Sequence, residues 1–141
     1  MISTQENRIR KALLDLAKEK IQAWESLSRN PGLSFSSQLR ASKIVSFWKT
    51  LMGRELGADV FDLVVRLRQD LGKTIEEIDA AEKRGEHRLD DGRKDQWLWN
   101  IDRAVQIQEV LEKIQNVAES IGLELPGEED RSAALLQGGQ E

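Results

Sequence analysis

The sequence contains no cysteine and no tyrosine among its 141 residues. A chain without thiols forms neither disulfides nor thiolate zinc sites, and a cytoplasmic location is favoured for it. No apolar run approaches the roughly 18 residues of a transmembrane helix, and the first residues show no apolar signal-peptide core. We therefore expect a soluble cytoplasmic protein without membrane contact.

Proline is also scarce, with two residues in the chain, so few positions interrupt a helix. Charged residues make up 33% and apolar residues 39% of the sequence, against about 25% charged residues in an average domain. This composition is typical of amphipathic helices with solvated outer faces. The length suits one domain that can bury a core.

The acidic excess of the chain is confined to its C-terminal segment. Residues 124–141 carry one arginine against five acids, which accounts for the whole net charge of −4. The segment has no apolar periodicity and is rich in polar residues and glycine, as disordered chains are. We predict a helical bundle domain over residues 1–124 and a disordered acidic tail over residues 125–141. The apolar cluster at residues 133–136 leaves docking of the tail on the body as an alternative.

Apolar residues recur every three or four positions between residues 9 and 121, the spacing of helices with one buried face. Breaks are predicted at Pro31, Gly53 and Gly72 and in the polar stretch 85–94. We therefore predict an all-α fold, a compact bundle of four or five helices with a long C-terminal helix.

Three patterns predict where helices begin. Ser3-Thr4-Gln5-Glu6 and Thr74-Ile75-Glu76-Glu77 are both capping boxes, in which a hydroxyl residue and a glutamate satisfy backbone N–H groups reciprocally. Asp59 precedes a clean apolar stripe and is predicted to cap another helix. With a stop at Gly72, the second capping box predicts a separate short helix from Thr74.

The last helix, predicted from about Asp95 to Ile121, is apolar on more than one side. Its stripe comprises Trp97, Ile101, Ala104, Ile107, Leu111, Ile114, Ala118 and Ile121, and Leu98, Val105, Val110 and Val117 form a second flank. A helix of this kind must be covered from more than one side, so we expect the bundle to be arranged around it.

The sequence contains four tryptophans, and three of them, Trp24, Trp48 and Trp97, fall on apolar stripes and are predicted in the core. Trp99 follows Trp97 by two positions and so points about 200° away from it on a helix. It is expected either in a second layer or on the surface, where aromatic residues are enriched in interfaces. Trp99 is therefore a candidate interface residue.

Residues 26–54 contain no acid but five cations, interleaved with serine and threonine. The cations are Arg29, Arg40, Lys43, Lys49 and Arg54. Cations beside small hydroxyl residues are typical of phosphate contact, although a nucleic-acid-binding domain is usually basic overall. The alternative is a basic outer face that pairs with acids of neighbouring helices.

The segments 55–60 and 71–77 resemble the second half of the all-α nucleotide pyrophosphohydrolases of the MazG type. The resemblance implies a magnesium site in which two pairs of carboxylates, Glu-x-x-Glu and Glu-x-x-Asp on successive helices, hold a triphosphate. Here Glu55 and Asp59 are four positions apart rather than three, and residues 26–54 offer no first pair. We therefore do not expect this activity.

No other catalytic or cofactor pattern stands out. The sequence has no Gly-rich phosphate loop, and its one histidine, His87, lies in a charged stretch expected to be a solvated loop. The acids Glu76, Glu77, Asp79 and Glu82 suit a helix N-terminus better than a cation site. We expect no enzyme activity, no metal and no cofactor.

Two functional hypotheses follow. The first is a non-catalytic helical subunit or adaptor that acts through contacts with a partner protein or a second copy of itself. The second is a small helical subunit of a nucleoprotein complex, which contacts phosphates through residues 29–54.

Overall fold

The computed structural model describes residues 4–53, 57 and 59–126. It contains α1 (Thr4–Ser28), α2 (Phe35–Gly53), α3 (Val60–Lys83), the short 3₁₀ turn η2 (Glu86–Arg88) and α4 (Gly92–Ile121). The described residues form no strand, so the predicted all-α bundle is confirmed. Residues 127–141, most of the predicted tail, lie outside the described residues, as does Ser3 of the first capping box.

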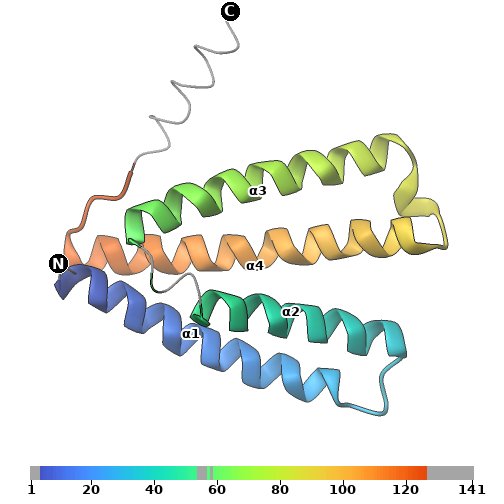
Figure 1. Cartoon of the computed structure of the whole chain (residues 1–141), viewed down its shortest axis with the longest axis horizontal. Coiled ribbons are helices and arrows are strands. Elements are labelled where there is room, and N and C mark those ends of the chain that lie inside the picture. The colour runs from blue at the N-terminus through green and yellow to red at the C-terminus, as the bar shows by residue number, and fades with distance from the viewer. Residues whose placement is uncertain (1–3, 54–56, 58, 127–141) are drawn as a thin grey trace, which may run out of the picture.

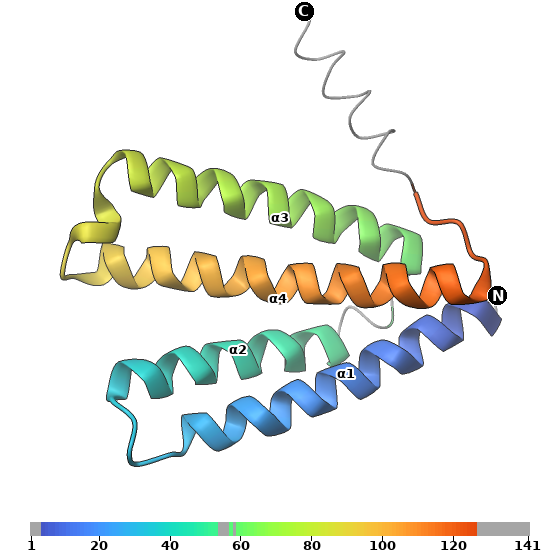
Figure 2. The same cartoon turned by 180° about the vertical axis from the view of Figure 1, so that it is seen from behind.

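The bundle consists of two antiparallel hairpins, α1–α2 and α3–α4 (Figure 1). Helix α4 packs against each of the other three helices, as its apolar flanks predict. The hairpins lie close together where α1 begins and α4 ends, and they diverge toward the α1–α2 and α3–α4 turns (Figure 2). No described helix combines the length and the apolar composition that a membrane crossing requires.

The core lies along the half of the bundle where the hairpins converge. Its buried members are Ile9, Leu13, Ala17, Ile44, Trp48, Leu51, Val60, Leu63, Val64, Leu67, Ile107, Val110, Ile114 and Ala118. Trp48 is the largest fully buried side chain, and its Nε1 donates a hydrogen bond to Oε1 of the buried Gln106 at 2.9 Å. Each side chain thereby satisfies a polar group that burial would otherwise leave unpaired.

Helix α3 corrects the predicted break at Gly72. It continues from Val60 to Lys83, and Gly72 does not adopt the positive φ of a helix stop. The Thr74 hydroxyl, expected to cap a new helix, is nearly buried and instead donates to the carbonyl oxygen of Asp70 at 2.7 Å. A mid-helix glycine costs only about 1 kcal/mol, which packing along α4 offsets.

The predicted loop 85–94 is shorter than expected. Gly85, with a φ of 72°, follows α3 in the left-handed region that favours glycine, and η2 comes directly after it. Helix α4 begins at Gly92, because the Asp91 side chain accepts a hydrogen bond from the Arg93 backbone N–H at 2.9 Å. Gly122, with a φ of 71°, ends α4 as predicted.

The predicted cap at Asp59 is confirmed, and it yields a stability prediction. Its Oδ1 accepts hydrogen bonds from the backbone N–H groups of Phe61 and Asp62, at 2.8 and 3.3 Å. Asp59→Ala should lower the free energy of unfolding by about 1 kcal/mol, measured by urea denaturation. Asp79→Ala, which changes an exposed acid near the C-terminal end of α3, is the control and should cost little. Equal losses in the two variants would contradict the capping role.

Candidate functional site

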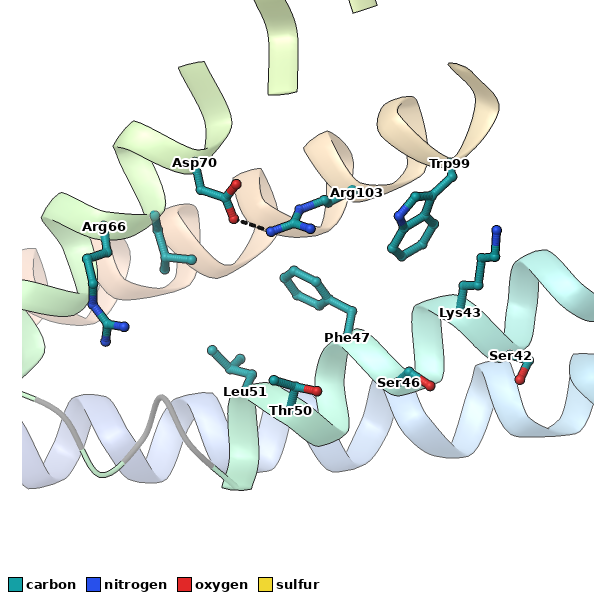
Figure 3. A pocket seen from close by; sticks show the side chains of 11 residues that line it. Ser42, Lys43, Ser46, Phe47, Thr50, Leu51, Arg66, Asp70, Trp99 and Arg103 are labelled. Carbon is teal, nitrogen blue, oxygen red and sulfur yellow. Dashed lines mark hydrogen bonds and ion pairs between the residues drawn. The ribbon is translucent and has the colours of Figure 1, made fainter. Parts of the chain in front are cut away.

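A groove of about 590 Å³ lies between the diverging hairpins. It is lined from α2 by Ser42, Lys43, Ser46, Phe47, Thr50 and Leu51, from α3 by Arg66, Leu67 and Asp70, and from α4 by Trp99 and Arg103 (Figure 3). The divergence of the hairpins exposes side chains there that would otherwise meet across the bundle. Two other recesses, of about 400 and 200 Å³, lie beside Arg68 and Leu125.

The groove has an apolar floor formed by two aromatic rings and two leucines. The Phe47 ring packs edge-on against Trp48, with ring centroids 5.4 Å apart and planes at 78°. Leu51 and Leu67 are buried core residues that reach the groove from below, and Trp99 is partly buried against the same core. Partly exposed aromatic rings backed by a rigid core are typical anchoring points for a bound apolar side chain.

The rim of the groove is cationic. Among the described lining residues, Lys43, Arg66 and Arg103 stand against one acid, Asp70, which is ion-paired with Arg103 across α3 and α4 (Figure 3). The Lys43 Nζ lies 5.8 Å from the centroid of the Trp99 ring, within cation–π range. The described lining residues therefore include more cations than acids.

Hydroxyl groups line one wall of the groove. Ser42, Ser46 and Thr50 follow one another at intervals of one helical turn on α2, and all three are exposed. They offer donors and acceptors for a backbone or polar side chain laid along α2.

Two cations of the predicted basic stretch form ion pairs within the bundle. Arg40 donates from Nε and one Nη to both carboxylate oxygens of Asp102 on α4, at 2.9 and 2.8 Å. This side-chain hydrogen bond raises the pKa of Arg40. Lys49 Nζ lies 3.0 Å from Oε1 of Glu25 on α1, and the hydrogen bond from Lys49 lowers the pKa of Glu25.

The other three cations of the stretch occupy different places. Lys43 lines the groove, whereas Arg29 is exposed just after the end of α1. Arg54 lies outside the described residues. Arg40 and Lys49 thus behave as the alternative for this stretch expects, since they join α2 to acids of its neighbouring helices.

The tryptophans only partly follow the sequence prediction. Trp48 is fully buried, and Trp24 packs partly buried against the core. The prediction that Trp97 lies in the core is wrong. It is half-buried outside the core, donates from Nε1 to Glu82 at 3.3 Å, and lies against the His87 ring. The α3–α4 connection thus holds Trp97 at the end of the bundle, while Trp99 faces the groove.

Several lining residues escaped the sequence reasoning. Phe47 lies next to Trp48 in the sequence but off the apolar stripe, so the periodicity does not indicate it. Arg66, Asp70 and Arg103 resemble ordinary charged residues on the solvent-exposed faces of two helices. The sequence does indicate Lys43 as a possible phosphate contact and Trp99 as a candidate interface residue. The structure brings these two side chains together. Their 56-position separation in sequence left no local signal of the contact.

The residues considered for catalysis that the structure describes have other contacts. The Asp59 carboxylate is used as a helix cap, His87 packs against Trp97, and Glu55 lies outside the described residues. Within residues 4–53, 57 and 59–126, no three histidine or acidic side chains are grouped so that they could hold a metal ion.

No protein-family model matches the chain, and no curated protein or solved structure is similar enough to count as a match. The groove must therefore be interpreted from its own chemistry.

Proposed function

We propose that this protein is a non-catalytic helical subunit or adaptor, whose groove between α2, α3 and α4 binds an acidic segment of a partner protein through apolar anchors. A second copy of the chain is included among the partners of this kind. One observation carries the proposal, namely that partly exposed aromatic rings and a net cationic rim meet in one groove.

The apolar floor and the cationic rim favour the same type of occupant. An amphipathic helix or extended peptide can place leucine-sized side chains between Phe47 and Trp99 while its acids face Lys43. Apolar burial supplies most of the affinity, and charge complementarity supplies specificity and association rate. A rigid, preformed groove reduces the ordering cost of binding on the side of this protein.

Nucleic acid is the second candidate, and a specific feature favours it. Lysine, arginine, hydroxyl groups and a tryptophan ring in one groove are also the chemistry with which single strands are held, by phosphate contacts and base stacking. Against it, Arg40 and Lys49 are engaged by Asp102 and Glu25, which removes two of the five cations on which the hypothesis rested.

A binding assay with defined probes tests the proposal. The first probe is a synthetic amphipathic peptide with leucine anchors and an acidic face, the second is the same peptide with lysines in place of its acids, and the third is an oligothymidine. We expect the acidic peptide to bind most tightly, with an affinity that falls as salt is added because charges at the rim are screened. Tighter binding of the oligonucleotide would favour the second candidate instead.

Charge reversal at the rim should reduce this binding. Lys43→Glu is expected to weaken the acidic peptide about tenfold, roughly 1.4 kcal/mol, because it places a like charge beside the peptide's acids and removes the cation from above Trp99. Isothermal titration calorimetry measures the change.

Lys18→Glu is the matched control, since Lys18 is an exposed lysine of α1 that does not line the groove. It should leave the affinity nearly unchanged. If the two reversals weaken the peptide equally, binding reflects overall charge and not the groove.

A further inference from the structure

We propose that the chain's own C-terminal segment, residues 127–141, occupies the groove and regulates access of a partner to it. This inference rests on the proposed function of the groove, and it names the acidic, leucine-containing segment that competes for the same site.

The described part of the chain ends close to the groove, beside α3. Leu125 packs partly buried against the core, and the carbonyl oxygen of Pro126 accepts a hydrogen bond from the Arg68 guanidinium. Arg68 is two positions from Arg66, which lines the groove from the same helix. Pro126, the last described residue, therefore lies beside α3 near the level of the groove, on the face of the helix that carries Arg68.

The segment is also long enough to extend from Pro126 to the groove. Residues 127–141 span up to roughly 50 Å when extended, whereas a helix with its side chains is only about 10–12 Å across. Residues 127–132 span up to roughly 20 Å, which is about half the circumference of such a helix, so they can pass round α3 and residues 133–136 can enter the groove. The connection requires no rearrangement of the four helices.

The side chains of the segment complement those that line the groove. The segment begins with the acids Glu128, Glu129 and Asp130, and after a short spacer it carries Leu135 and Leu136. The groove offers the Lys43 cation at its rim and the Phe47 and Trp99 rings at its floor. Asp70, the one acid among its described lining residues, is already paired with Arg103.

Occupation in this way would make the groove self-regulated. A tethered segment acts at an effective concentration of about 1 mM. With an intrinsic dissociation constant of about 0.1 mM, it would weaken an external acidic peptide about tenfold without closing the site to a stronger partner. The masking should diminish at high salt, because the acids and the rim cations are then screened.

The test uses the full chain and two variants of the segment, E128K/E129K/D130K and L135S/L136S. Q137S/Q140S, which changes polar residues of the same segment, is the matched control. Two quantities are measured: the indole N–H resonance of Trp99, assigned with Trp99→Phe, and the affinity for the synthetic acidic peptide described above.

We expect both segment variants to move the Trp99 resonance and to raise the affinity for the peptide about tenfold. The control variant should change neither quantity, and the Trp48 resonance should stay unchanged in all forms.

A Trp99 resonance and a peptide affinity that are identical in all forms would overturn the inference, although peptide binding itself would still support the proposed function. If no form binds the peptide, the proposed function fails and the Trp99 resonance alone decides whether the segment occupies the groove. A resonance that changes on dilution would assign the occupant to a second copy and overturn occupation within one chain.

Discussion

Trp48→Ala is expected to destabilise the protein by about 3–5 kcal/mol, more than alanine at any other tryptophan. Trp48 is fully buried in the core, so its truncation leaves a cavity there. It also removes the donor to Gln106, whose buried amide oxygen then lacks its hydrogen bond.

Urea denaturation of Trp48→Ala, Trp48→Phe and Trp97→Ala measures this effect. Trp48→Phe keeps most of the apolar volume and should cost less than Trp48→Ala, and it remains informative if the alanine variant does not fold. Trp97→Ala should cost less as well, because Trp97 is half-buried outside the core. A larger loss at Trp97 than at Trp48 would place the core in the wrong half of the bundle.

Trp99→Ala is expected to have its main effect on binding. Removal of a groove-lining tryptophan should weaken the acidic peptide by about 2 kcal/mol, roughly thirtyfold, as at aromatic hot spots. Its cost in folding stability should be well below that of Trp48→Ala, since Trp99 is only partly buried against the core.

Leu98→Ala is the control for Trp99, because Leu98 is a half-buried neighbour on α4 that does not line the groove. It should leave the peptide affinity unchanged within a factor of two or so. Calorimetric titration and urea denaturation of both variants separate binding from folding. If Trp99→Ala binds the peptide as tightly as the unmodified protein does, the aromatic floor is not the anchoring point.

The helices and their ends could be predicted from the sequence because their signals are local. Asp59 caps α3 and Gly122 ends α4 as predicted, since each depends only on backbone groups within a few positions. The prediction of a helix end at Gly72 was wrong for a physical reason. A glycine followed by a capping box predicts a stop when the segment is considered alone, but the buried face of α3 continues through Thr74 to Ala81 and keeps the helix intact.

The groove could not be predicted, because it depends on how two hairpins diverge. Asp70 and Arg103 are 33 positions apart, and Arg40 and Asp102 are 62 apart, so nothing local in the sequence indicates that either pair meets. The acid-free stretch did draw attention to Lys43. The alternative for this stretch, a basic outer face that pairs with acids of neighbouring helices, agrees with the ion pairs of Arg40 and Lys49.

The location of binding is the most direct test of the groove as the working site of this protein. The four tryptophan indole N–H groups can be followed in one spectrum of the full chain, labelled with nitrogen-15, while the synthetic acidic peptide is added. We expect the Trp99 resonance to shift most, with Trp24 and Trp48 nearly unmoved and Trp97 affected little, because only Trp99 lines the groove. A titration in which the peptide binds but moves Trp24 or Trp97 and leaves Trp99 in place would contradict the account.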